Sequence, residues 1–233
     1  ADCDGTGAHS HPVLKNNTAV NGGAVAVTTG TPVMYCANFE GNTAEENGGS
    51  IYVANGGFTM NGGAISGGKL EESELNAKLG GAVYVSGGTF TMNDGTISGN
   101  KAKNGGATYV AESDSAKGNF VMNNGTLSNN IATENGGAAY ISGGNYTMED
   151  GTVNNNTATD YGGAVYVNNG NVTMTSGVVK NNATTAKKSV GGGFYVNGGS
   201  IIIGLPGCNG HGDNHNDDSA NKNHPQVINN KAQ

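Results

Sequence analysis

The stretch 80–102 reads GGAVYVSGGTFTMNDGTISGNKA and holds three short apolar runs separated by Gly, Asn and Asp. The first run spans 83–85, the second spans 90–92, and the third is centred on Ile97. The following stretch, 105–132, repeats all three runs with changed details. Self-similarity of this kind is the signature of a repeat protein.

The same three runs recur along most of the chain. The first run follows a Gly-Gly pair, the second ends in Met, and the third ends in Asn. The Gly-Gly pairs begin at Gly22, Gly48, Gly80, Gly105, Gly136, Gly162 and Gly191. No helical spacing of apolar residues accompanies the runs, because Gly and Asn interrupt the chain every few positions.

Strands this short cannot bury an apolar face alone, and a repeat of about 25 to 32 residues with three strands closes one turn of a solenoid. We therefore predict an all-β fold, a single-stranded right-handed parallel β-helix of about eight turns with three short strands per turn. Adjacent turns pair at about 4.8 Å, which gives a rod about 40 Å long.

The unbroken repeat predicts one β-solenoid domain over residues 1–233. An N-terminal extension covers 1–11 and the regular repeats cover 12–203. A His- and Asp-rich insertion at 204–225 then precedes the last strand at 226–233.

Alternation along each run assigns side chains to the core or to the surface. We expect the core to contain Val83, Val85, Phe90, Met92 and Ile97, together with their equivalents in other turns. Burial of each such side chain contributes about 1.5 to 3 kcal/mol, so the rod is expected to fold without a metal ion or a disulfide.

The same alternation puts Ala82 and Tyr84 on the outer face. An exposed aromatic ladder is then expected at Tyr52, Tyr84, Tyr109, Tyr140, Tyr166 and Tyr195. Stacked aromatic rings at strand spacing serve either to bind sugars or another subunit, or only to stabilise the sheet. If Ala and Tyr pointed inward instead, two rows of Val would face out.

The composition excludes several classes of partner. The net charge is −7 and all 11 basic residues are Lys, so clustered phosphate contacts to nucleic acid are not expected. No run of about 18 apolar residues is present, so no membrane span is predicted.

The chain opens on Ala1 rather than Met, which indicates a removed signal peptide or a cut at that point. With a removed signal peptide, the location is extracellular or at the cell surface.

Every His lies in the N-terminal extension or in the insertion at 204–225. The sequence Asp2-Cys3-Asp4-Gly5 resembles the start of a calcium loop, and the insertion alternates His and Asp as ligands on an extended segment would. These segments are either solvated polar loops or a site for calcium or a transition metal. The candidate ligands are Asp2, Asp4, His9, His11, His211, Asp213, His215 and Asp217.

Three cysteines are too few for a disulfide scaffold. In one rod Cys3 and Cys208 would lie about 40 Å apart, beyond the reach of about 7 Å that a disulfide allows. Both fall at the same place in the turn, so rods stacked head to tail would bring them together. We predict a Cys3–Cys208 bridge between subunits, with Cys3–Cys36 within one chain as the alternative.

The Gly-Gly-Ala-hydrophobe units, with third runs such as Phe39-Glu40-Gly41-Asn42, resemble the GGA[ILV] and FxxN repeats of chlamydial polymorphic outer-membrane proteins. More broadly, they are similar to the right-handed β-helix modules of microbial adhesin-like surface proteins. The resemblance covers about residues 12–203, and it implies a β-helix displayed at a cell surface.

Pectin-degrading enzymes share this architecture. Gly210-His211-Gly212 is similar to the GHG element of polygalacturonases, and Asp217-Asp218 to their paired acids. Their order along the chain is reversed, however, and the basic RIK element has no counterpart in a chain without Arg. Glycoside hydrolysis needs two carboxylates held rigidly about 5 to 9.5 Å apart, whereas these lie in a Gly- and Asn-rich bend. We therefore expect no enzymatic activity.

The leading hypothesis is a non-enzymatic extracellular structural protein whose rods assemble head to tail into a surface filament or sheath. The second is an adhesin or glycan-binding surface module, with glycans or a host surface as partner. A polysaccharide-degrading enzyme is the third.

Overall fold

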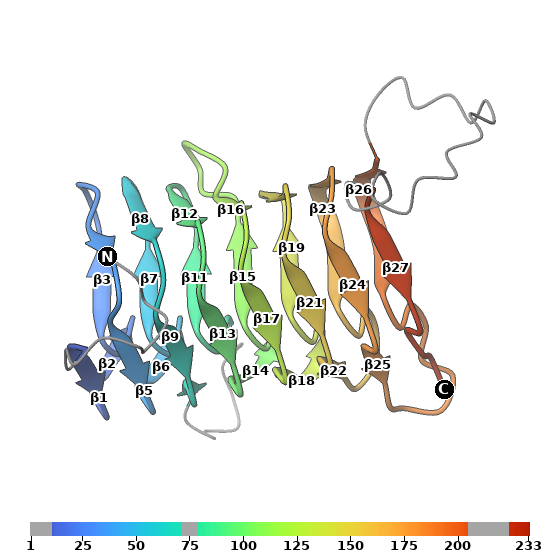
Figure 1. The fold of residues 1–233 in the computed structure, drawn as a ribbon, viewed down its shortest axis with the longest axis horizontal. Coiled ribbons are helices and arrows are strands. Elements are labelled where there is room, and N and C mark those ends of the chain that lie inside the picture. The colour runs from blue at the N-terminus through green and yellow to red at the C-terminus, as the bar shows by residue number, and fades with distance from the viewer. Residues whose placement is uncertain (1–10, 71–78, 205–223) are drawn as a thin grey trace, which may run out of the picture.

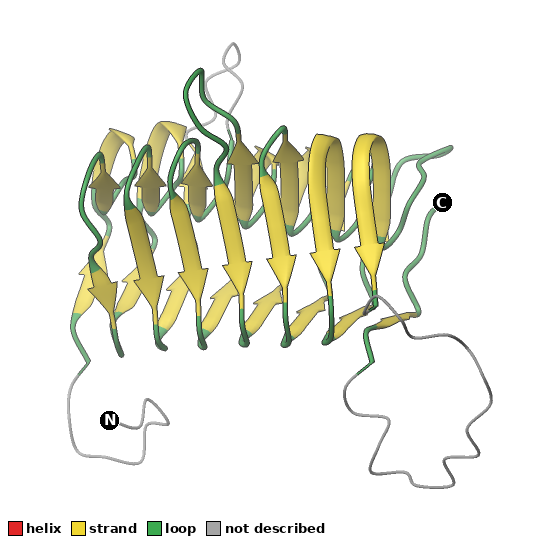
Figure 2. Cartoon of the chain, turned by 90° about the horizontal axis from the view of Figure 1, so that it is seen from above, coloured by secondary structure: helices red, strands yellow, loops and turns green. Residues whose placement is uncertain are grey.

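The computed structural model describes residues 11–70, 79–204 and 224–233, which wind into a rod of stacked coils (Figure 1). In these ranges the regular structure is strand, with no helix, and the strands that pair in the sheets are all parallel. Equivalent strands of successive coils lie side by side along the rod (Figure 2). The predicted parallel β-solenoid is therefore confirmed, with about seven turns, close to the eight expected.

The described strands form three sheets that run the length of the rod. The third runs make the 8-stranded sheet: β1 (Val13–Lys15), β5 (Asn38–Glu40), β9 (Ala64–Ser66), β13 (Thr96–Ser98), β17 (Thr126–Ser128), β21 (Thr152–Asn154), β24 (Val178–Lys180) and β27 (Gln226–Ile228).

The first and second runs share the 12-stranded sheet. Its strands are β3 (Val25–Val27), β4 (Val33–Met34), β7 (Ile51–Val53), β8 (Gly57–Met60), β11 (Val83–Val85), β12 (Thr89–Met92), β15 (Thr108–Ala111), β16 (Asn119–Met122), β19 (Ala139–Ser142), β20 (Asn145–Met148), β23 (Val165–Met174) and β26 (Phe194–Ile203). In β23 and β26 the two runs join into one strand of 10 residues.

A fourth short strand in each coil forms the 7-stranded sheet, a strand that the sequence pattern does not indicate. In several coils its inward residue is only an Ala, as at Ala102 and Ala132, so the apolar signal in the sequence is weak. The strands are β2 (Thr18–Asn21), β6 (Thr43–Asn47), β10 (Lys69–Leu70), β14 (Lys101–Asn104), β18 (Ile131–Asn135), β22 (Thr157–Ala158) and β25 (Ala183–Thr184).

The core is assembled as predicted, since Val83, Val85, Phe90, Met92 and Ile97 are all fully buried. Rings in the second runs stack from coil to coil at 5.2 to 5.4 Å between centroids. The methionines at the ends of these runs pack beside them and pair with one another in register.

The prediction that Ala82 lies on the outer face is wrong. Ala82 is fully buried in the core cluster. The backbone N–H groups of Ala82 and Val83 both donate to the carbonyl oxygen of Ala107, at 2.9 and 3.0 Å. Two residues thus face one partner, as in a β-bulge, and consecutive side chains point the same way.

The corner after the third run holds a column of asparagines, here called the Asn ladder: Asn17, Asn42, Asn100, Asn130, Asn156, Asn182 and Asn230. All but the two end members are buried. Gly68 takes the position between Asn42 and Asn100, and its backbone N–H donates to the Oδ1 of Asn100 at 2.8 Å. At each step from Asn100 onward, the side-chain Nδ2 and the backbone N–H donate to the Oδ1 of the next Asn, as from Asn130 to Asn156 at 2.9 and 3.0 Å. Along this part of the ladder the buried amides satisfy one another.

The segment 111–118 lengthens one bend without disturbing the coils. Ser113 and Ala116 close it with hydrogen bonds, and it projects beside β15 and β16 (Figure 1). Before and after it the register is kept, with Val85 opposite Val110 and Thr89 opposite Asn119.

We predict that Asn130→Ala lowers the free energy of unfolding by about 1 to 3 kcal/mol. The change leaves the buried donors of Asn100 without the acceptor that they now reach at 2.9 and 3.1 Å. Asn93→Ala is the matched control, because Asn93 belongs to an exposed amide ladder where water replaces the lost bonds. Urea unfolding of both variants measures the difference, and equal losses would contradict a special role for the buried column.

We also predict that Met92→Asp prevents soluble expression, whereas Thr91→Asp does not. Met92 is fully buried between stacked coils, so a carboxylate there would lose its hydration without a partner. Thr91 points to the outer side of the same strand, with Thr59 and Val121 as register neighbours. Comparison of soluble yields checks the assignment, and equal yields would refute it.

Candidate functional site

The most extensive candidate surface is the tyrosine row, defined as Tyr52, Tyr84, Tyr109, Tyr140, Tyr166 and Tyr195. These residues are direct register partners in β7, β11, β15, β19, β23 and β26. In the interior strands the flanking residues, such as Val83 and Val85, fill the core, so the tyrosine lies on the outer side.

The rings of the tyrosine row stack face to face along the rod. Centroids of register neighbours are 4.7 to 5.4 Å apart, and their planes differ by only 5 to 23°. Each interior ring therefore has both faces occupied by its neighbours. At the N-terminal end the row stops, because Ala26 is the register partner of Tyr52.

The row is less exposed than the sequence predicts. Tyr109 and Tyr166 are only 9% and 8% exposed, while the other four rings are half-buried. Tyr161, 38% exposed, also joins the stack, with its ring 4.7 Å from that of Tyr195. Tyr161 bridges to Asn135, and so takes the corner position that is Asn in several other coils. This Tyr in place of Asn before a Gly-Gly pair is visible in the sequence, and it is the signal by which Tyr161 could have been recognised as a candidate.

Burial changes the acidity of the row. It raises the pKa of Tyr84 to about 12, with a further contribution from the neighbouring hydroxyls of Tyr109 and Tyr52. Burial also raises the pKa of Tyr140, although a hydrogen bond with Asn168 opposes the change. For Tyr109 burial raises the pKa, and a hydrogen bond with Ser142 lowers it. Tyr84, Tyr109 and Tyr140 are accordingly uncharged at neutral pH.

This geometry limits how the row can bind a partner. A sugar that stacks on an aromatic residue needs a free ring face, and here only the two ends of the row can offer one. Along its length the row presents ring edges and hydroxyl groups. Its most direct effect is on the rod itself, because stacked aromatic pairs across paired strands contribute about 0.2 to 1 kcal/mol each.

The predicted metal ligands lie almost entirely outside the described residues. Those not described are Asp2, Asp4, His9, His211, Asp213, His215 and Asp217. His11 is described and is half-buried beside the start of β1. Across the described ranges, no group of three or more His, Cys, Asp or Glu side chains is placed to hold a metal ion.

Cys36 is disulfide-bonded. Cys3 and Cys208, the two cysteines of the predicted bridge between subunits, lie outside the described residues.

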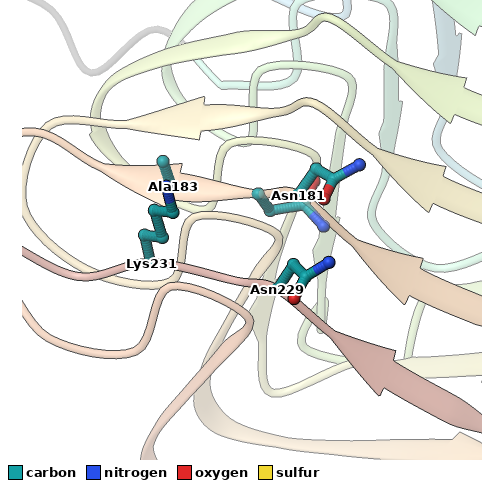
Figure 3. Close-up of a pocket in the computed structure, with 5 residues that line it drawn as sticks. Asn181, Ala183, Asn229 and Lys231 are labelled. Atoms are coloured by element: carbon teal, nitrogen blue, oxygen red, sulfur yellow. The ribbon is translucent and has the colours of Figure 1, made fainter.

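A shallow pocket lies near the C-terminal end of the Asn ladder (Figure 3). It is lined by Asn181, Asn182, Ala183, Asn229 and Lys231. The lining offers amides and one amine but no carboxylate, so this pocket lacks the paired acids of a glycosidase. Within the described ranges, no helix is long and apolar enough to cross a membrane.

Three segments of the chain match the family model of the Chlamydia polymorphic membrane protein repeat, at residues 37–54, 94–111 and 150–168. The resemblance predicted from the sequence is therefore confirmed. No curated protein and no solved structure matches the chain in the corresponding searches.

The structure explains the residues that the repeat requires. Each matched segment runs from the third-run strand, through the Asn ladder and the 7-stranded sheet, to the next first run. In the second segment Ile97 fills the core and Asn100 joins the ladder. Gly105 turns the chain with φ of 68°, a conformation that favours glycine. A Cβ on Gly106 would collide with the backbones of Gly137 and Ile131 in the next coil.

The raised pKa values predict a loss of stability in strong base. The pKa of Tyr84 in the folded chain is about 12, whereas in the unfolded chain the hydroxyl releases its proton near its ordinary pKa of about 10. The unfolded state therefore binds fewer protons between these values, and stability falls as pH rises through this window. Urea midpoints at about pH 9 and pH 11 measure the fall.

Tyr84→Phe is the control for this effect, since it keeps the ring and removes the ionisable hydroxyl. The variant is expected to lose less stability than the parent over the same pH interval. An identical fall in both proteins would contradict the assignment to Tyr84.

Proposed function

We propose that the chain is a non-enzymatic structural protein of the extracellular surface, and that its rods stack head to tail into a filament or sheath. Its match to a repeat of polymorphic membrane proteins supports a place at the cell surface. The observation that most supports head-to-tail stacking is that, in the described part of the chain, the edge of the last coil is unpaired. This coil is built like an interior coil but pairs on one side only among the described strands.

Core positions of that coil are open to solvent. Ile203 and Val227 are 47% and 46% exposed, whereas their register partners one coil earlier, Met174 and Val179, are each 1% exposed. Core positions of the first coil are better covered, as at Val27 with 3% exposure, so the larger apolar opening is at the C-terminal coil. Burial of apolar area at about 25 cal/mol per Å² favours a further coil there.

The two ends of the Asn ladder are complementary. Asn17 donates twice to Asn42, at 3.0 Å, but within the described residues its own Oδ1 accepts no hydrogen bond. Asn230 accepts two bonds from Asn182, at 2.9 Å, but its backbone N–H donates none there. If the first coil of one copy followed the last coil of another, the donors of Asn230 would face the acceptor of Asn17. Only head-to-tail stacking matches donors with acceptors in this way.

We predict that Ile203→Lys weakens self-association of the full chain, because it places a charge in the apolar opening. Ile202→Lys is the matched control, since Ile202 is 53% exposed on the outer side of the same strand. Sedimentation velocity over a range of concentrations is expected to show oligomers for the parent and for Ile202→Lys. Negative-stain images of the parent should show rods longer than one chain.

Two results would contradict the proposal. One is a parent protein that stays monomeric at every concentration. The other is equal association by the two lysine variants, which would place the contact elsewhere on the rod.

The second candidate function is an adhesin or glycan-binding module, which the match to a membrane-protein repeat also favours. Binding would use the ring edges and hydroxyls of the tyrosine row, or the free faces at its ends. Retention of the monomeric Ile203→Lys variant on a glycan array would support this candidate over the filament. The third candidate, a polysaccharide-degrading enzyme, depends on His211, Asp217 and Asp218, which lie outside the described residues.

A further inference from the structure

The tyrosine row is an array of phenols held in contact by the register of the sheet. We propose that it is a site of oxidative modification, in which a haem peroxidase with hydrogen peroxide joins tyrosines of adjacent coils as dityrosine. The bond would link one coil of a chain to the next coil of the same chain. This inference is independent of end-to-end assembly, because all the reacting groups belong to one rod.

Register and stacking supply the required proximity. Tyr84 and Tyr109 are direct partners in β11 and β15, with centroids 5.4 Å apart and planes that differ by 9°. Tyr109 and Tyr140 are closer still, at 4.8 Å and 5°. Parallel pairing holds the backbones about 4.8 Å apart, so each phenol has a second phenol beside it at all times. Two radicals would not need to find each other by diffusion.

A further tyrosine, stacked on the end of the row, lies within reach of an oxidant in solution. Tyr161 is 38% exposed, and its ring stacks on that of Tyr195 at 4.7 Å. Tyr195 in turn stacks on Tyr166 at 5.4 Å. An electron removed at the exposed end can thus be replaced from rings deeper in the row, without entry of the peroxidase.

The other ladder of stacked rings in the protein lacks the chemistry. Its members are Phe58, Phe90, Phe120 and Tyr146, and only the last has a hydroxyl group. Tyr146 is 2% exposed, and its hydroxyl donates to the sulfur of Met122 at 3.6 Å. Coupling between coils is therefore confined to the outer row.

The reaction balances with one equivalent of peroxide. Each of two phenols gives up one electron and its hydroxyl proton to become a phenoxyl radical. The radicals form a carbon–carbon bond between the ring positions ortho to the hydroxyls, and the ortho hydrogens move to the oxygens to restore both phenols. The two electrons and two protons reduce one hydrogen peroxide to two waters. The protein loses two hydrogen atoms for each bond formed.

Trypsin cleavage isolates the central pair without ambiguity. Cleavage after Lys residues yields peptide 79–101, in which Tyr84 is the only tyrosine, and peptide 104–117, in which Tyr109 is the only tyrosine. The full chain is treated with horseradish peroxidase and hydrogen peroxide at low protein concentration, and the monomer band is digested. Mass spectrometry is expected to find the two peptides joined, with their summed mass reduced by two hydrogens.

Tyr109→Phe is the matched variant, because it keeps a ring in the stack and removes the hydroxyl. It is expected to abolish the joined peptide while leaving the folded rod intact by circular dichroism. The same oxidation in concentrated urea should give at least tenfold less of this joined pair, since register is lost. The proposal is overturned if the monomer yields no joined peptide although other tyrosines are oxidised. It is also overturned if urea leaves the yield unchanged.

Discussion

Stacking of each residue on its counterpart in the next coil is the interaction on which the rest of this structure depends. Because adjacent strands pair in parallel at about 4.8 Å, each position of the repeat forms a column of side chains along the rod. The side chains in a column are in contact with residues of the same or a similar type, and these contacts must be favourable. Phe and Met columns meet this requirement through apolar contact and the Asn ladder through amide pairs. The Gly column does so because Gly106 and its equivalents have no Cβ to collide with the coil beyond. Charged side chains repel their own kind, and they are correspondingly few, at 12% of the chain.

At two places where charged residues stack, the column changes sign from one coil to the next. Lys15 lies against Glu40 at 3.0 Å, and Lys103 against Glu134 at 3.3 Å. These pairs are exposed, so each contributes at most about 1 kcal/mol. Their main effect is to avoid the like-charge contact that an exact repeat would impose.

The columns also explain what the sequence could and could not predict. Apolar runs with strand period make the fold and the core recognisable, because apolar residues recur at the positions of Phe90 and Met92 in one coil after another. The fourth strand escaped prediction since Ala102 gives too small an apolar signal, and Ala82 was misplaced because a shared acceptor breaks the alternation. For the tyrosine row, sequence identifies the members, but ring spacing and burial depend on three-dimensional packing. Tyr161 joins the row only through a corner that folding brings beside Tyr195.

The loop at 111–118 shows how such a rod can change without being redesigned. Its ends enter and leave the sheet at the register of the neighbouring coils. Eight residues separate Val110 from Asn119, against three between Val85 and Thr89, and the five additional residues leave that register unchanged. Loop closure grows only slowly in cost with length. A bend of this kind is therefore a site where insertions of variable sequence are tolerated. A rod of stacked coils offers one such insertion site per turn, at a fixed spacing. Unrelated peptides placed there would be displayed in a line, with the scaffold beneath them unaltered.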